Sequence, residues 1–97
     1  MANAKNSPAL FIVSCEDADA LFAVYADNKR EANFQVTTMV KDHISAIEDA
    51  ETDGESPPDV PASVRRIIAL RNGMKKKQRI GAMFKSELQL ELGDSSV

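Results

Sequence analysis

Residues 36–50, Val-Thr-Thr-Met-Val-Lys-Asp-His-Ile-Ser-Ala-Ile-Glu-Asp-Ala, carry the clearest structural pattern in the chain. One side of this segment repeats at spacings of three and four residues: Val36, Met39, Val40, His43, Ile44 and Ile47. The spacing predicts an amphipathic helix that buries this side, because an α-helix turns once in about 3.6 residues. Thr37 or Thr38 is the expected N-cap, and a short strand over residues 33–36 is expected before it.

The residues before this helix contain one predicted strand and one segment whose sequence is compatible with either a helix or a strand. Ala9-Leu-Phe-Ile-Val-Ser-Cys15 is short, apolar and β-branched, as in a buried strand. In residues 16–30, the spacing of Ala18, Leu21, Phe22 and Tyr25 would place them on one face of a helix. Residues 21–25 also fit a strand, which would follow a hairpin loop. Both a helix and a hairpin therefore remain open for this segment.

A polar segment rich in proline follows the helix. Residues 51–59, Glu-Thr-Asp-Gly-Glu-Ser-Pro-Pro-Asp, predict a loop, since each proline forces extended backbone on the residue before it. Pro61 then marks the start of a second helix and Asn72-Gly73 its end, with Gly73 expected in the left-handed conformation. The inner face of this second helix is expected to hold Val64, Ile67, Ile68 and Arg71.

The C-terminal segment alternates in hydropathy. Apolar side chains occupy the even positions apart from Ser86: Ile80, Ala82, Phe84, Leu88, Leu90 and Leu92. This period of two predicts one long strand, or two shorter strands bent near Gly81 or Ser86. The elements together predict an α+β fold: a small β-sheet with one amphipathic helix packed on it, a linker, a second helix and a C-terminal strand.

Length and composition fit a single compact domain. The 97 residues are 43% hydrophobic and 28% charged, enough for one modest core. We expect an acidic α+β part over residues 1–55 and, over residues 56–97, a Pro-containing linker followed by a basic helix and terminal strand. The single cysteine, Cys15, excludes an intramolecular disulfide. No apolar run approaches the roughly 18 residues of a spanning helix, so a cytoplasmic protein without membrane contact is expected.

The charges are divided unevenly along the chain. Residues 1–59 hold four basic and twelve acidic residues, a net charge of −8, whereas residues 60–97 hold eight basic and three acidic residues, a net charge of +5. No acidic residue occurs from Val60 to Ser86. The overall net charge of −3 therefore conceals a basic segment.

Patterns typical of catalysis or metal binding are absent from the sequence. His43 falls on the apolar side of the predicted helix, where a histidine bonded at a core edge is commoner than a general base. Cys15 lies at the end of a predicted apolar strand, and an apolar environment lowers the reactivity of a thiol. One histidine and one cysteine cannot supply the four ligands of a structural zinc site. We therefore expect no catalytic residue, metal or cofactor, with a cysteine-dependent enzyme as the remaining alternative.

The basic segment carries the main functional pattern. Seven cations occur within fifteen positions: Arg65, Arg66, Arg71, Lys75, Lys76, Lys77 and Arg79. Such clusters bind nucleic-acid phosphates, because each neutralised phosphate releases counterions. Phe84, the only aromatic residue nearby, falls on the apolar side of the tail, which favours phosphate contacts with a duplex over base stacking on a single strand. Two further roles for these cations stay open: they solubilise the surface, or they pair with the acidic half.

The order of elements resembles HicB-like antitoxins. The matching segments are Leu10–Ser14, Ala20–Ala26, Phe34–Val36, a helix Thr38–Ala50 and the acidic loop Asp53–Pro58. The resemblance covers about residues 9–60 and implies strands, a hairpin, a helix and a DNA-binding C-terminus. The family's Pro-Gly-Cys-like turn is replaced here by residues 28–31, and residues 60–97 align with no DNA-binding pattern of the family.

These observations predict a non-catalytic regulatory protein of antitoxin or repressor type. Its basic segment would contact nucleic-acid phosphates, and its acidic half would contact a protein partner. The alternative is a small inhibitor or adaptor, encoded by a phage or plasmid, that acts on a host protein without binding nucleic acid. In that case the tail would form an edge strand for dimerisation or target binding, through Phe84, Leu88, Leu90 and Leu92. Self-association into a homo-oligomer is expected in either case.

Overall fold

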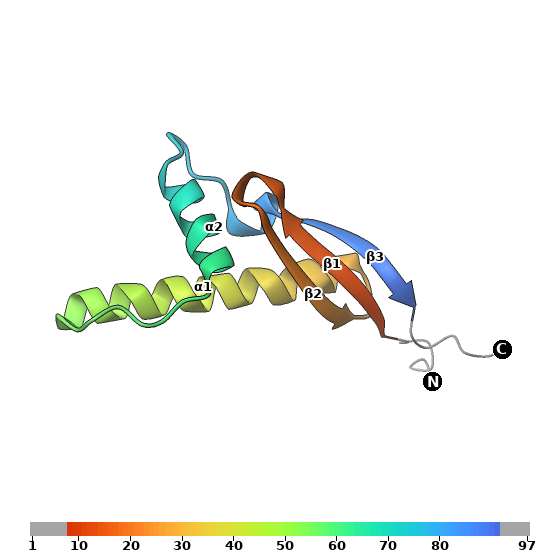
Figure 1. Cartoon of the computed structure of the whole chain (residues 1–97), viewed down its shortest axis with the longest axis horizontal. Helices are drawn as coiled ribbons and strands as arrows, with labels where there is room; N and C mark the ends of the chain where they lie inside the picture. Colours follow the sequence, from red (N-terminus) through yellow and green to blue (C-terminus); the bar gives the residue numbers. More distant parts are fainter. Residues whose placement is uncertain (1–7, 92–97) are drawn as a thin grey trace.

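The computed structural model of the chain describes residues 8–91 (Figure 1). In chain order the elements are β1 (Ala9–Cys15), the 3₁₀ turn η2 (Glu16–Ala18), β2 (Ala20–Ala26), α1 (Lys29–Asp53), α2 (Ala62–Asn72), the 3₁₀ turn η3 (Ile80–Met83) and β3 (Lys85–Glu91). The strands form an antiparallel sheet in the order β2-β1-β3, with the long helix α1 packed on one face. The predicted α+β fold is therefore confirmed.

Within residues 16–30, residues 16–26 form the hairpin turn and its second strand, and not the alternative helix. Asp19 closes the turn with a φ of 52°, and its N–H donates to the carbonyl oxygen of Glu16 at 3.0 Å. Aspartate tolerates this left-handed conformation better than larger side chains do. The pairing runs from Cys15 opposite Ala20 to Ala9 opposite Ala26. The hairpin buries Ala20 and Ala26 at the two ends of β2 and leaves Leu21 exposed.

Helix α1 begins earlier than predicted. Its N-cap is Asn28, whose side-chain oxygen accepts from the Glu31 N–H at 2.8 Å, while the Asp27 N–H donates to the Glu31 carboxylate at 3.2 Å. This reciprocal capping starts the helix at Lys29. The predicted strand over residues 33–36 and the threonine N-caps are therefore wrong, because the cap at Asn28 extends the helix through them.

The other boundaries are closer to expectation. Gly54, with a φ of 73°, caps α1, so that the helix includes the first three residues of the predicted loop. Helix α2 ends at Asn72 as predicted, but Gly73 has a φ of −83° and is not left-handed. Its N–H still donates to the carbonyl oxygens of Ala69 and Leu70, which closes the helix without the glycine-specific conformation.

The C-terminal segment only partly follows its alternating pattern. Residues 80–83 form the turn η3, and strand β3 starts at Lys85. The prediction of a continuous strand from Ile80 is wrong, because Ile80 turns into the core and the Gly81 carbonyl oxygen accepts a hydrogen bond from the Asn33 side chain at 3.1 Å. Along β3, the register against β1 shifts by one residue between Phe11 and Leu10. Leu92 lies outside the described residues.

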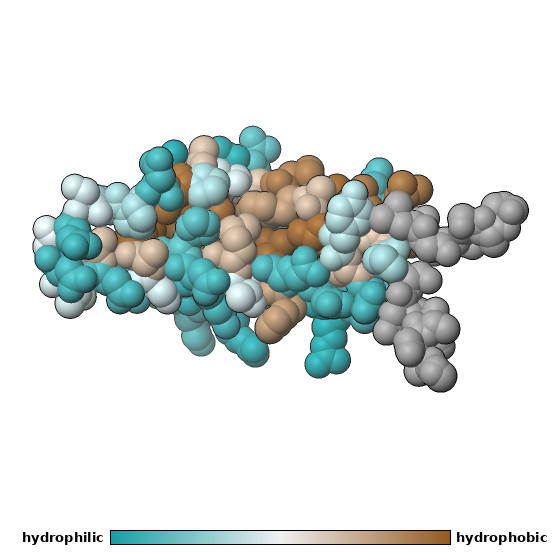
Figure 2. Space-filling view, turned by 90° about the horizontal axis from the view of Figure 1, so that it is seen from below, coloured by the Kyte–Doolittle hydropathy of each residue, from teal (hydrophilic) through white to brown (hydrophobic). Residues whose placement is uncertain are grey.

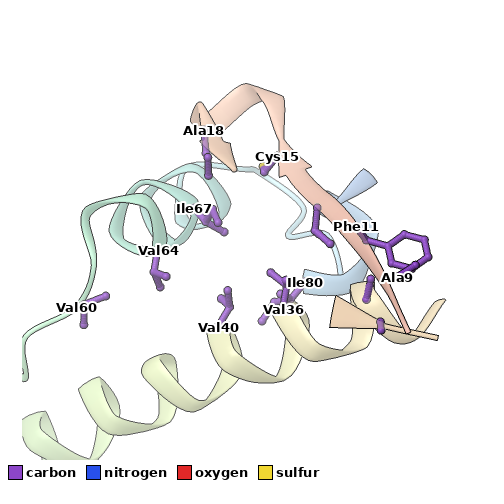
Figure 3. Packing of buried hydrophobic residues seen from close by; sticks show 14 residues of the cluster. Ala9, Phe11, Cys15, Ala18, Val36, Val40, Val60, Val64, Ile67 and Ile80 are labelled. Atoms are coloured by element: carbon purple, nitrogen blue, oxygen red, sulfur yellow. The ribbon is translucent and has the colours of Figure 1, made fainter. Parts of the chain in front are cut away.

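The core joins the acidic and basic parts of the chain. Val64 and Ile67 of α2 face Val36 and Val40 of α1, and Ile80 closes the gap toward the sheet (Figure 3). From β1 the cluster takes Phe11 and its neighbours on the same face: Ala9, Val13 and Cys15. The core therefore lies between one face of the sheet and the two helices.

Candidate nucleic-acid interface

An open groove of about 1120 Å³ lies between the N-terminal half of α1 and the segment that joins α2 to β3. Five cationic residues line it: Lys29, Arg30, Lys41, Arg71 and Arg79. The first three come from the half of the chain with a net charge of −8, and the last two come from the basic segment. Folding thus collects into one surface cations that lie up to fifty positions apart in the sequence.

One carboxylate, Glu31, occurs among the described residues that line the groove. Its side chain accepts from the Asp27 N–H and sits in the first turn of α1, where the helix dipole favours a negative charge. Glu31 therefore serves the helix cap, and the groove keeps an excess of four positive charges.

Two of the predicted cations have structural partners. Arg66 donates to the carbonyl oxygens of Ala18 at 2.8 Å and Asp19 at 2.7 Å, which ties α2 to the tip of the β1–β2 hairpin. Arg71 donates through Nε to the Gln78 carbonyl oxygen at 2.8 Å and closes the turn after α2. Arg66 is thus held outside the groove, whereas Arg71 both closes this turn and lines the groove.

The remaining predicted cations are exposed. Arg65 lies on α2, and the three lysines of residues 75–77 lie on the turn after it, none of them lining the groove; Arg79 does line it. Within residues 8–91 the one ion pair joins Lys85 to Glu87 at 3.8 Å. Across this part of the chain, no cation of the basic segment pairs with a carboxylate of the acidic half.

Sequence reasoning missed the contribution of α1 to this surface. Arg30, Phe34, Thr38 and Lys41 lie at spacings of four, four and three, which places them along one side of the helix. This stripe can be read from the sequence once the helix starts at Lys29. The predicted N-cap at Thr37 or Thr38 placed Arg30 and Phe34 outside the helix, so the stripe was not recognised.

The second predicted surface, in the C-terminal tail, is divided between two faces of the sheet. Phe84 is half-buried with its ring 6.3 Å from that of Phe22 in an edge-to-face arrangement. Leu88 pairs with Phe11 on the face toward α1, whereas the register shift pairs Leu90 with Leu10 on the opposite face. Both leucines are exposed.

The sheet face opposite α1, which we call the outer sheet face, is mainly apolar and is covered by none of the described elements. Its polar positions are Ser14, Lys85 and Glu87, and its apolar residues are Leu10, Ile12, Leu21, Ala23, Tyr25 and Leu90. Leu21 is 65% exposed and Tyr25 is 62% exposed. In Figure 2, hydrophobic side chains gather over the half of the molecule that holds the sheet, whereas the surface over the C-terminal half of α1 is mainly hydrophilic.

The residues weighed for catalysis lie elsewhere. Cys15 is a buried free thiol at the end of β1, and His43 is half-buried on α1. Among residues 8–91, no three His, Cys, Asp or Glu side chains gather as a metal ion would require. None of the helices in this part of the chain has the length and apolar character to cross a membrane.

Comparison with known proteins found no matching family model, no similar curated protein and no similar solved structure.

Proposed function

We propose that this chain is a non-catalytic, cytoplasmic regulatory protein, of antitoxin or repressor type, that binds nucleic-acid phosphates in the groove between α1 and the α2–β3 connection. One observation carries the proposal: the groove gathers five cationic residues and a single carboxylate, that of Glu31, which takes part in the N-terminal cap of α1. Electrostatic binding to a polyanion needs such clustering on one surface. The lysines of residues 75–77 follow Arg71 along the chain and would extend the cationic path.

Most of the carboxylates that follow Lys41 lie toward the C-terminal end of α1 and the loop after it, away from the groove; Asp42, next to Lys41, is the exception. Seven carboxylates and no lysine or arginine occur between Lys41 and Arg65, and all seven are exposed. Along α1, Asp53 lies about 28 Å from Phe34 at the groove, well beyond the roughly 8 Å over which physiological salt screens charges. We propose that this acidic end contacts a basic surface of a protein partner.

Salt dependence of binding tests the proposal. Five phosphate contacts would give a slope of log K against log salt of about −4.5 on a duplex. Replacing Arg30 or Arg79 with alanine is expected to flatten the slope by about one contact each and to weaken binding to all sequences alike. Lys85→Ala removes the same charge outside the groove and serves as the control.

The proposal fails if neither DNA nor RNA, single-stranded or duplex, binds at about 50 mM salt. It also fails if Lys85→Ala flattens the slope as much as Arg79→Ala, because the effect would then reflect net charge and not the groove.

The outer sheet face supports a second candidate function, a protein-binding inhibitor or adaptor that assembles as a homodimer. The charges on this face, Lys85 and Glu87, pair with each other, so two copies can meet without like-charge repulsion. Leu21→Lys is expected to convert a dimer to a monomer in size-exclusion chromatography with light scattering. A wild-type chain that is monomeric at high concentration would refute self-association through this face.

A further inference from the structure

Phe34 is the most exposed large hydrophobic residue among those that the structure describes. Its side chain is 67% exposed, and it lines the cationic groove. The side of α1 that enters the core holds Ala32, Val36 and Val40, all fully or almost fully buried. Core packing therefore does not account for an aromatic ring at position 34.

Two of the groove residues on the Phe34 side of α1 are cationic, while Glu31, three residues before Phe34, is engaged in the helix cap. Arg30 lies four residues before it and Lys41 seven residues after it on the same side of the helix, about 6 Å and about 10 Å along the axis. An aromatic ring between two cations matches the arrangement by which proteins hold a single strand, with bases on the ring and phosphates on the cations.

The wall that carries Phe34 is held in place by hydrogen bonds. Asn33 donates to the Gly81 carbonyl oxygen at 3.1 Å and accepts from the Thr37 hydroxyl at 2.8 Å. Gly81 approaches this pair closely: a Cβ at that position would meet Thr37 Oγ1 at 3.4 Å and Asn33 Oδ1 at 3.5 Å. These contacts attach α1 to η3, so the two walls of the groove are joined and Phe34 is presented on a fixed surface.

We propose that the groove binds single-stranded nucleic acid, with one base stacked on Phe34 and the flanking phosphates on Arg30 and Lys41. This inference rests on the proposed function and specifies its ligand. A duplex keeps its bases stacked on one another, so their faces are closed to Phe34 and only base edges, sugars and phosphates are exposed, on which a ring cannot stack. The sequence favoured a duplex because residues 65–79 and their surroundings hold almost no aromatic residues. Phe34 lies outside this basic segment and joins the groove only in the folded structure.

The test compares a labelled single-stranded DNA of about 12 nucleotides with the duplex of the same sequence, by fluorescence anisotropy at about 50 mM salt. Phe34→Leu keeps the bulk of the side chain and removes the ring. We expect it to weaken single-strand binding by about tenfold, within the roughly 5- to 140-fold that one stacked base contributes, and to leave the salt slope unchanged. Phe34→Tyr keeps the ring and is expected to bind like the wild type.

Tyr25→Leu is the matched control, because it removes a similarly exposed ring from the outer sheet face. Single-strand binding that falls with Phe34→Leu but not with Tyr25→Leu supports the proposal. Tighter binding of the duplex, or equal loss for both probes in Phe34→Leu, overturns the stacking inference while the phosphate-binding function stands. Failure of both probes to bind removes the proposed function itself.

Discussion

The hydrogen bonds of Arg66 to the hairpin tip predict that this residue stabilises the fold and does not bind phosphate. Its Nε donates to the carbonyl oxygen of Ala18, a buried residue, at 2.8 Å, and its Nη2 donates to the Asp19 carbonyl oxygen at 2.7 Å. Arg66→Ala removes both bonds and leaves the partly buried Ala18 acceptor without its donor. The neighbouring Arg65 has no side-chain hydrogen bond within the described residues and supplies the control, Arg65→Ala.

The expected loss follows from the exposure of the two bonds. A bond from a charged donor at a partly buried site contributes about 1.5 kcal/mol, and the exposed bond, in competition with water, about 0.5 kcal/mol. Arg66→Ala should therefore lower the free energy of unfolding by about 2 kcal/mol. Arg65→Ala should change it by less than about 0.5 kcal/mol, as surface substitutions usually do.

Urea denaturation followed by far-ultraviolet circular dichroism measures the difference. With a slope near 1.5 kcal/mol per molar urea, the Arg66→Ala midpoint should fall by about 1.3 M and the Arg65→Ala midpoint by less than about 0.4 M. At urea-free conditions, where both variants are folded, Arg66→Ala should bind DNA within about twofold of the Arg65→Ala variant. Equal midpoints for the two variants, with weaker DNA binding by Arg66→Ala, would refute the reasoning and return Arg66 to the phosphate-binding set.

Four further substitutions test the core packing, the helix cap and a buried hydroxyl by the same urea titration. Ile67→Ala empties a fully buried site between α2 and α1 and should cost about 3 kcal/mol, whereas the half-buried Ile68→Ala should cost less than half of that; similar costs would contradict the packing. Asn28→Ala removes the N-cap of α1 and should cost about 1 kcal/mol, so an unchanged midpoint would argue against the cap. Ser86 Oγ is buried without a hydrogen-bond partner among the described residues, so Ser86→Ala should raise stability by about 1 kcal/mol; a fall would show that the hydroxyl is bonded in solution.

Several elements could be predicted from local patterns. Strand β1 and helix α2 lie where β-branched content, a proline start and a glycine stop predicted them. The apolar stripe of α1 is also confirmed, because Val36 and Val40 are fully buried. These elements were predictable because their hydrophobic period is unambiguous and their ends carry residues with strong backbone preferences.

Other segments could not be assigned from their own residues. Residues 20–26 fit a helix and a strand equally well over so short a span, and pairing with β1 selects the strand. Residues 80–83 alternate like a strand, yet Ile80 enters the core and Gly81 packs against Asn33 and Thr37 of α1, which turns the backbone. In both places tertiary contacts override the local period.

The groove also depends partly on local sequence and partly on tertiary packing. The cations of residues 65–79 are visible as a cluster in the chain, and from that cluster phosphate binding is a natural expectation. The partners that complete the groove are separate in sequence: Lys29, Arg30, Phe34 and Lys41 belong to a helix in the acidic half. Charge and periodicity are local properties, so the residues themselves dictate them. Which charges share a surface depends on how α1 packs against the α2–β3 connection, a contact between segments some forty positions apart.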